Sequence, residues 1–467
     1  MNNTDPRELI LKSPMSRMQI SIIVITVLLN ALDGFDVLSI SFASPLITAE
    51  FGIDNRVVGF VLSMELIGMG IGSIFLGGAA DRFGRRPLML GALALMSLGM
   101  FMVTTPDGAI ARLVQGAFNS VGLFETWPVG IFHISFWRII TGIGIGGMLA
   151  AINAVVAENS NEKRKHMNVC LMAIGYPLGA WLGGFVASWL LIENTWHAVF
   201  YLGFGMTVSL IPIVYFFVPE TVHWLARKQP AGALEKINAS ITRMGHAPVT
   251  VLPVITDEIR KQSVMDIFSP KLIRTTAVVA SAYFLHIMTF YFIIKWVPNI
   301  LVGWGFEPAR AGFVLSWANF GGALGGLTMA FLTLKYNLKL LTIAAMCVST
   351  VMVVVFGRSP ETVMALTIIC ASAGFFTNAT INGMYALFAH CYPTHVRAVG
   401  TGFAIGFGRG GAILAPILAG YLFAGGIGVP NTAVIMASGS LLAALALSFL
   451  VFRPEPPEAA SVVKGVA

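Results

Sequence analysis

Two aspartates lie near the middle of an apolar segment, where a carboxylate could carry a proton. The stretch LLNALDGFDVLSIS contains Asp33 and Asp36, and the apolar run around it extends from about residue 19 to residue 47. A carboxylate at the centre of a membrane-spanning helix costs roughly 2.5 to 3.5 kcal/mol on insertion scales. Because removal from water disfavours the charged form, such a group can exchange a proton at physiological pH. The i, i+3 spacing places both side chains on one helix face, with Gly34 between them leaving room for backbone adjustment. We interpret the pair as proton carriers; the alternative for either one alone is a structural ion pair with a buried cation.

A third acid and three cations also lie inside apolar runs. Glu65 is deep enough in its run to join a proton pathway, and pairing with a buried cation explains it equally well. The cations are Arg138, Lys295 and Arg409. An arginine fork matches a carboxylate in bidentate geometry, so these residues point to an anionic substrate. Lys295 lies near the outer end of its run and can snorkel to the interface. Arg138 can instead pair with Glu158 or with an acid of the first run.

The composition indicates a membrane protein with many spans. Of the 467 residues, 56% are hydrophobic, only 11% are charged and 49 are glycines, which is too apolar for a soluble chain of this length. Windows of about 20 apolar residues predict an all-helical protein with twelve transmembrane helices. The predicted spans are 19–47, 56–79, 87–104, 134–158, 166–190, 196–218, 274–300, 308–333, 338–356, 361–388, 396–424 and 430–452.

The lysines and arginines predict the orientation of these helices. If the connections after odd-numbered spans are outside, only Arg56, Arg112, Arg310 and Arg358 of the 29 basic residues lie there. Most of the others then face the cytoplasm, as the positive-inside rule requires, and both chain ends are cytoplasmic. The net charge of +7 is explained by this topology without a nucleic-acid partner. We expect no cleavable signal peptide, and the four cysteines lack metal-ligand spacing.

The spans divide into two sets of six, which predicts two pseudo-symmetric bundles. We expect an N-terminal bundle over residues 1–218, a cytoplasmic linker over 219–273 and a C-terminal bundle over 274–467. The glycine-rich segment GYPLGAWLGG in the fifth span is echoed by GRGGAILAPILAG in the eleventh. Parallel six-helix repeats with a site near the midplane are typical of one large class of secondary transporters. Glycines also simply allow membrane helices to approach closely.

The loop between spans two and three carries the most specific motif. GGAADRFGRRP, residues 77–87, resembles the G-x-x-x-D-R-x-G-R-R signature of the major facilitator superfamily at every defining position. The resemblance implies the twelve-helix fold of that superfamily and a cytoplasmic latch, in which Asp81 lies against the N-terminus of the eleventh helix near Arg397. The alternative is a merely basic cytoplasmic loop, and the equivalent loop after span eight, LTLKYNLK, has no Asp-Arg pair. The residues of the expected gating motif are Gly77, Asp81, Arg82, Gly84, Arg85 and Arg86, with Glu158 and Arg397.

Four further stretches resemble the aromatic acid:H+ symporter family. They are DGFD in span one, RIITGIGIGGMLAAINAVVAE in span four, PETVHWL after span six, and YPTHVRAVGTGFAIGFGRGGAILAP leading into span eleven. The resemblance implies a proton-coupled importer of aromatic carboxylates such as benzoate, hydroxybenzoate or protocatechuate-type acids, working in a bacterial inner membrane. It also makes Arg409 the favoured anchor for the substrate carboxylate. Protons are then the coupling ion, with no other cofactor and no metal, and we expect the protein to act as a monomer in the bilayer.

One stretch departs from the family pattern. The connection over residues 105–133 is longer than the family's usual short turn, and its apolar residues follow helical spacing. We expect an interfacial helix there, and a decorative insertion is a better explanation than a lid.

Spans seven and ten contain residues that could hold an aromatic acid. Lipid-facing rings are the ordinary explanation for most of the phenylalanines, so the polar members are more informative. Polar side chains in hydrocarbon need partners, and the ring hydroxyls of a hydroxybenzoate could be among them. The substrate-binding candidates are Arg409, Arg138, His286, Tyr291, Lys295, Asn378, Asn382 and Tyr385.

Three other functions fit parts of this pattern. A proton-coupled carrier of aliphatic organic acids or osmolytes would share the loop motif and many glycines. An exporter of cationic drugs would not be expected to bury Arg409, and a transporter-like sensor would keep the fold without transport. The sequence shows no nucleophile-base arrangement, metal cluster or phosphate loop, so we do not expect an enzyme.

Overall fold

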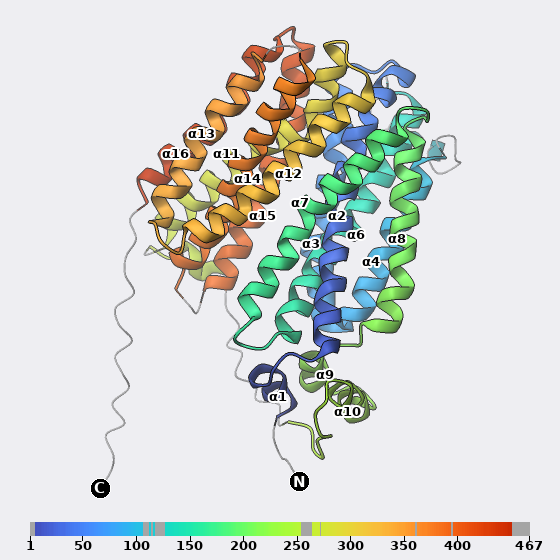
Figure 1. The fold of residues 1–467 in the computed structure, drawn as a ribbon, viewed down its shortest axis with the longest axis vertical. Helices are drawn as coiled ribbons and strands as arrows, with labels where there is room; N and C mark the ends of the chain where they lie inside the picture. The colour runs from blue at the N-terminus through green and yellow to red at the C-terminus, as the bar shows by residue number, and fades with distance from the viewer. Residues whose placement is uncertain are drawn as a thin grey trace.

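The computed structural model describes residues 5–105, 112–113, 115–116, 127–253, 264–270, 272–359, 362–393 and 396–450. Within these ranges the chain is helical and has no strand. Twelve long helices form the body of the molecule (Figure 1). The first six are α2 (Arg17–Phe51), α3 (Asn55–Phe83), α4 (Arg85–Val103), α6 (Val129–Asn159), α7 (Lys165–Leu190) and α8 (His197–Phe217). The second six are α11 (Ile273–Gly303), α12 (Pro308–Leu332), α13 (Leu338–Phe356), α14 (Val363–Cys391), α15 (Arg397–Ala424) and α16 (Val429–Ser448).

Eleven of these helices in the described chain are long and apolar enough to cross a membrane. The remaining one, α12, has 25 residues and lies within the bundle beside α14 and α7. Each long helix coincides with one of the twelve predicted spans to within a few residues, so the predicted helical architecture is confirmed.

Local sequence signals fix the ends of the first two long helices. Ser16 and Gln19 form a reciprocal capping box at the start of α2, and Gly52 ends that helix in the left-handed conformation. Asp54 then accepts a hydrogen bond from the backbone N–H of Val57 and caps α3. The short connection between α2 and α3 is therefore a turn specified by its own sequence, and the two apolar segments are separate helices.

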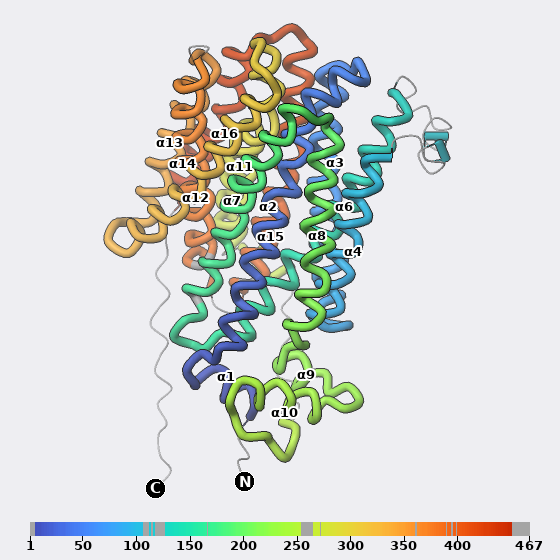
Figure 2. Tube along the Cα trace, turned by 45° about the vertical axis from the view of Figure 1, so that its right-hand side comes forward, coloured from blue at the N-terminus to red at the C-terminus, as the bar shows by residue number. Residues whose placement is uncertain are grey.

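A small helical unit lies at the end of the bundle where α2 begins. It comprises α1 (Pro6–Lys12), α9 (Val222–Lys228) and α10 (Ala233–Arg243), which lie side by side in both views (Figures 1 and 2). Their buried apolar residues form a separate cluster of Ile10, Val222, Leu225, Ala226, Ile237, Ile241, Met244 and Val249. The stretch predicted as a linker thus contains α9, α10 and the short 3-10 helix η1 (Val264–Phe268). The expected interfacial helix of residues 105–133 falls mostly outside the described residues.

The two six-helix halves meet mainly through α7 with α12, α3 with α15 and α2 with α11, and α2 also contacts α12. At the end far from α1, Ser63 of α3 donates a hydrogen bond to the Ile413 carbonyl of α15 over 2.9 Å. A Cβ on Gly59 would lie 2.5 Å from the Pro416 carbonyl oxygen, so these helices touch backbone to backbone there.

Toward the end that carries α1, the same two helices are apart. Gly70 and Gly78 of α3 and Gly402 and Gly406 of α15 have no atom within 4 Å of the position a Cβ would take. The halves are therefore closed at the end far from α1 and open at the end near it. We call these the closed end and the open end.

Candidate functional site

Both aspartates of α2 are completely buried. Asp33 and Asp36 are 0% exposed, and none of their carboxylate oxygens has a hydrogen-bond partner among the described residues. Gly34 between them serves a packing role, because a Cβ there would lie 2.0 Å from the Tyr176 carbonyl oxygen. This close approach of α2 to α7 differs from the backbone adjustment that we expected at Gly34. Neither carboxylate has the hydrogen bonds that a structural buried carboxylate would have, although Asp36 lies within electrostatic range of the Arg138 guanidinium.

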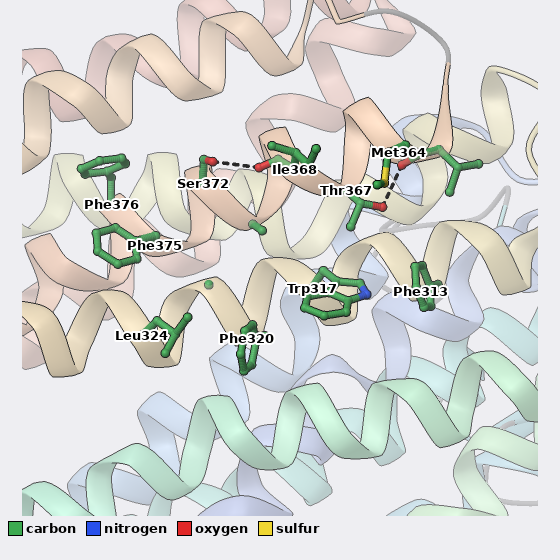
Figure 3. Close-up of a pocket in the computed structure, with 13 residues that line it drawn as sticks. Phe313, Trp317, Phe320, Leu324, Met364, Thr367, Ile368, Ser372, Phe375 and Phe376 are labelled. Carbon is green, nitrogen blue, oxygen red and sulfur yellow. Dashed lines mark hydrogen bonds between the residues drawn. The ribbon is translucent and has the colours of Figure 1, made fainter.

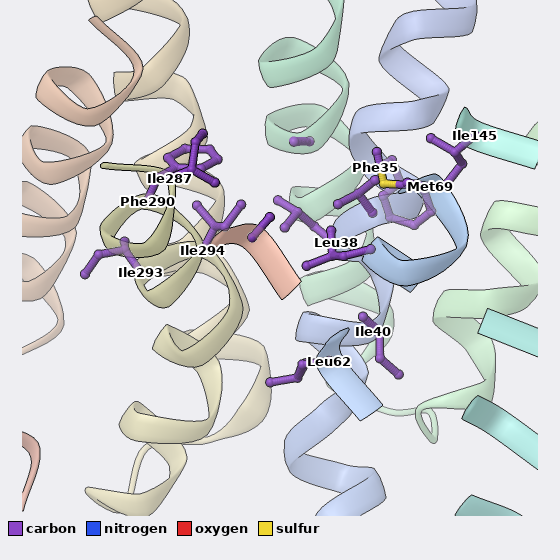
Figure 4. Close-up of a cluster of buried hydrophobic side chains, with 14 of the residues drawn as sticks. Phe35, Leu38, Ile40, Leu62, Met69, Ile145, Ile287, Phe290, Ile293 and Ile294 are labelled. Carbon is purple, nitrogen blue, oxygen red and sulfur yellow. The ribbon is translucent and has the colours of Figure 1, made fainter. Parts of the chain in front are cut away.

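Apolar side chains surround this part of α2. Phe35 and Leu38 of α2, Met69 of α3 and Ile145 of α6 belong to one buried cluster with residues of α11 (Figure 4). Leu38 faces Ile294 of α11 across the contact between the halves (Figure 4). The surroundings are therefore poor in polar groups, which strengthens every electrostatic interaction among the buried charges.

Glu65 pairs with Arg138 inside the N-terminal half. The Arg138 guanidinium and the Glu65 carboxylate form an ion pair in which both side chains are fully buried. Arg138 also donates to the backbone carbonyl of Asp36 over 2.8 Å and lies over the Phe200 ring, 5.6 Å from its centroid. The expected partners of Arg138 were Glu158 or an acid of the first span. The structure instead supplies an acid of the second span, because Glu158 lies at the far end of α6.

Lys295 reaches inward and does not snorkel to the membrane surface. Its side chain is 0% exposed, its Nζ lies 3.7 Å from Glu65 Oε2, and it donates a hydrogen bond to the Val37 carbonyl of α2. Lys295 belongs to α11 of the C-terminal half, whereas both partners belong to the N-terminal half. The predicted snorkelling is therefore wrong.

Arg409 is the intramembrane cation of the described chain that has no acidic partner. It is half-buried on α15, and among the described residues no hydrogen bond or ion pair engages its guanidinium. It lies within electrostatic range of the hydroxyl groups of Tyr176, Tyr283 and Tyr291. A half-exposed guanidinium without a protein partner among the described residues, within electrostatic range of phenol hydroxyls, can bind a carboxylate attached to a ring.

The tyrosines within electrostatic range of Arg409, and Tyr385 that is hydrogen-bonded to one of them, come from both halves. Tyr176 belongs to α7, and its hydroxyl interacts with that of Tyr291 on α11. Tyr283 of α11 and Tyr385 of α14 share a hydrogen bond of 3.0 Å between their hydroxyls. Tyr291 and Tyr385 were predicted from the sequence, whereas Tyr176 was not. The sequence feature that could have indicated Tyr176 is its position in the glycine-rich GYPLGAWLGG segment. Close packing at the glycines of this segment lets the tyrosine side chain reach the middle of the bundle.

The other polar candidates are held by protein groups. The ring nitrogens of His286 contact Ser440 Oγ at 2.8 Å and the Thr377 carbonyl at 3.0 Å, so this buried residue joins α11 to α16 and α14. Asn378 and Asn382 donate to carbonyls one turn earlier in α14, and their amides lie against Gly322 and Gly326 of α12. These bonds leave His286 no free ring nitrogen for a ligand.

The GGAADRFGRRP loop between α3 and α4 takes part in a network of ion pairs and hydrogen bonds at the open end. Arg85 lies 2.9 Å from Asp81 and 2.9 Å from Glu158, and Thr221 donates to the other oxygen of Glu158. Asp81 also lies 4.0 Å from Arg227 of α9. Of the remaining motif residues, Arg82 lies over the Phe83 ring, Gly77 comes near Ala150, and Arg397 donates to the Tyr392 carbonyl. In this state no bond joins Asp81 to the described part of α15.

Glu220 is part of the same network and was not among the residues predicted from the sequence. Its carboxylate accepts hydrogen bonds from the backbone N–H groups of Arg85, Arg86 and Thr221, and so caps α4, which begins without a side-chain cap of its own. Burial raises the pKa of Glu220 above its usual value, against the lowering effect of these three bonds. Gly84 has φ +108° and a Cβ there would strike the Glu220 carboxylate, so the loop requires glycine at this position.

A groove between α12 and α14 has the wrong chemistry for an anion. Its volume is about 740 Å³, and its walls carry apolar side chains from the two helices (Figure 3). Its lining contains no charged residue and consists of Phe313, Trp317, Phe320, Gly321, Leu324, Val363, Met364, Thr367, Ile368, Ala371, Ser372, Phe375 and Phe376. The region around Arg409 is therefore the better candidate for a carboxylate site.

The sequence matches one protein family along nearly its whole length. Residues 26–305 and residues 279–465 each match the family described as Major Facilitator Superfamily. The chain belongs to the major facilitator superfamily. Its membership makes the protein a transporter and not an enzyme. The expected architecture of two six-helix bundles is confirmed.

Curated relatives of the chain are carriers of aromatic acids. The chain is 28% identical to the 4-hydroxybenzoate transporter of Acinetobacter baylyi, over 88% of this chain and 86% of that protein. It is 25% identical to the gallate transporter of Pseudomonas putida, over 95% of this chain and 94% of that protein. These similarities agree with the resemblance to the aromatic acid:H+ symporter family.

Solved structures show the same fold at lower identity. The partially occluded inward-open conformation of the xylose transporter from E. coli has a TM-score of 0.70 and 17% identity, and the match covers 93% of this chain and 98% of that one. The inward-open conformation of the same transporter has a TM-score of 0.67 and 18% identity, with 94% and 98% covered.

For a major facilitator protein, the position of Asp81 predicts a change in turnover. Asp81→Asn removes the charge that faces Arg85 and Arg227 here and that would meet the positive N-terminus of α15 when the open end closes. We expect slower transport with little change in substrate affinity, because the loop is remote from Arg409. Initial rates of uptake over a range of substrate concentrations measure the two separately. Turnover equal to that of the wild type would exclude a latch at Asp81.

Proposed function

We propose that the protein is a proton-coupled symporter that imports aromatic carboxylates by alternating access. The observation that carries this proposal is the unpaired Arg409 among tyrosines contributed by both halves. A carboxylate there would complete the bidentate pairing that the guanidinium lacks within the chain. The tyrosine rings and hydroxyls would contact the aromatic part of the substrate. The names of the relatives, which are transporters of 4-hydroxybenzoate, gallate and benzoate, support the same substrate class.

Proton coupling in this proposal rests on Asp33 and Asp36. An anion that enters against a negative-inside potential of 100 mV meets a cost of about 2.3 kcal/mol, and an accompanying proton cancels its charge. The two buried acids, which have no hydrogen-bond partners among the described residues, are the groups best placed to carry that proton. Glu65 is less suited to this task because it already balances Arg138 and Lys295.

The described state corresponds to the inward-facing stage of this cycle. The closed end then faces outside, and the open end, which bears α1, α9 and α10, faces the cytoplasm. In this orientation both chain ends lie on the cytoplasmic side of what we propose is the bacterial inner membrane, and the positive-inside distribution of the lysines and arginines supports the orientation. We propose that each monomer transports independently, because each contains both halves of the site.

Uptake by reconstituted vesicles tests the proposal. Purified protein in proteoliposomes should accumulate labelled benzoate or 4-hydroxybenzoate when the outside is made acidic, and a protonophore should abolish the accumulation. An aliphatic acid of similar charge, such as succinate, tests the alternative carrier function. Accumulation of the aliphatic acid in place of the aromatic acids would overturn the substrate class, and accumulation without a pH gradient would overturn the coupling.

A further inference from the structure

Glu65 is the point where charges from the two halves of the protein meet. Its carboxylate lies between Arg138 of its own half and Lys295 of the other half, with Lys295 Nζ at 3.7 Å. All three side chains are fully buried. Lys295 makes a second contact across the same boundary by donating to the Val37 carbonyl. Arg138 and Glu65 would remain together if the halves moved apart, whereas Lys295 would lose both partners.

The polar bonds between the halves are concentrated around this charge cluster. Besides the two contacts of Lys295, the hydrogen bonds that cross the boundary between described residues include Ser63 to Ile413 and Asn299 to Ser44. Ser63 precedes Glu65 in α3, and Asn299 follows Lys295 by one helical turn in α11. These neutral bonds lie at the closed end. The Glu65–Lys295 ion pair lies next to them, on the side that faces the middle of the bundle.

The energetics favour a role in holding this end closed. A carboxylate and a carbonyl at contact distance offset the cost of removing the Lys295 ammonium from water. If the halves began to separate at this end, the Lys295 ammonium would lose both partners before water could solvate it. A buried charge that has lost its partner is costly. The pair therefore biases the protein toward the state in which the closed end stays closed.

We propose that Glu65 and Lys295 form an interdomain lock that keeps the far end closed while the α1 end is open. Lys295 is then a positioning residue that acts on the conformational equilibrium and does not bind substrate. The lock rests on the alternating-access part of the proposed function, and it is independent of the substrate class and of the proton carriers.

Distance measurements between spin labels test the lock directly. Asn194 follows α7 and Arg310 lies near the start of α12, and both side chains are exposed at the closed end in different halves. Cysteines at these two positions, in a background without the four native cysteines, carry the labels. In proteoliposomes without substrate we expect one main short distance for otherwise wild-type protein. Lys295→Met should raise the ratio of long to short distances on the order of tenfold.

Further variants show whether a shifted distance distribution reflects loss of the Glu65–Lys295 pair or a general loss of structure. Lys335→Met removes an exposed lysine of the same half and should leave the distance distribution unchanged. Glu65→Gln should shift the distribution in the same direction as Lys295→Met, and the double variant should shift it little beyond either single variant. Additive shifts would mean that the two residues act independently.

The outcome also distinguishes the lock from the proposed transport function. A Lys295→Met protein that keeps the wild-type distance distribution but binds substrate more weakly would overturn the lock and make Lys295 a ligand. A shifted distribution in a protein that transports no aromatic acid would leave the lock standing and overturn the substrate class.

Discussion

The double variant Asp33→Asn, Asp36→Asn is expected to lose all accumulation of substrate against its gradient. Asparagine keeps the size and much of the hydrogen-bonding capacity of aspartate but cannot release a proton near neutral pH. Both positions are fully buried and without hydrogen-bond partners among the described residues. The substitution should therefore preserve the fold while it removes the two groups that we assign to proton transfer. Uptake in proteoliposomes with an imposed pH gradient measures the loss.

Exchange of substrate across the membrane separates coupling from folding in this variant. Exchange of labelled for unlabelled acid needs no net proton movement, so it should persist when accumulation is lost. Asp54→Asn is a matched control, since Asp54 is a partly exposed helix cap and asparagine caps helices equally well. That control should accumulate substrate like the wild type. Concentrative uptake by the double variant would show that another group carries the proton, and Glu65 would be examined next.

The twelve helices could be predicted from the sequence because each requires only local information. An apolar run of about 20 residues is long enough to span the bilayer, and the positions of the charged residues divide one run from the next. The boundary between α2 and α3 shows this well, since Gly52 and Asp54 mark it in the sequence and form its turn in the structure. Membership in the major facilitator superfamily was predicted from the loop motif for the same reason.

The partners of the buried charges could not be predicted in this way. Glu65 and Arg138 are far apart in sequence, and several acids were equally available to Arg138 on the basis of helix position alone. The direction of Lys295 was predicted wrongly because its place near a helix end suggested water as its nearest partner. The structure shows instead that α2 and α3 supply a carbonyl and a carboxylate to its buried ammonium.

The packing role of Gly34 could not be predicted from the sequence either. Glycine between two acids suggested a flexible backbone, but the structure places the Tyr176 carbonyl where a side chain would be. The same contact brings Tyr176 itself into the middle of the bundle. Close packing between α2 and α7 thus explains the glycine between the two acids and contributes Tyr176 to the candidate substrate site.

Substitution of Arg409 should have the largest effect on substrate binding. Arg409→Ala removes the one intramembrane cation of the described chain without an acidic partner, and we expect affinity for aromatic acids to fall by at least about 30-fold. Arg409→Lys keeps the charge but loses the planar fork, so it should weaken binding by an intermediate amount. Binding of labelled 4-hydroxybenzoate to purified protein measures both. Arg358→Ala, at an exposed arginine outside the bundle interior, serves as the control and should bind normally.

The substrate carboxylate can be tested from the other side of the same contact. Methyl esters of the same acids retain the ring but have no negative charge, so they should compete poorly with the acid for the wild-type protein. For Arg409→Ala the ester and the acid should compete equally, because the group that distinguishes them is gone. This loss of discrimination identifies Arg409 as the anchor more sharply than a loss of affinity does, since a distorted site would weaken both ligands alike. Equal competition by acid and ester in the wild type, or unchanged acid binding by Arg409→Ala, would place the anchor elsewhere. Lys295 and Arg138 would be the next positions to test, although each already has a carboxylate partner in Glu65.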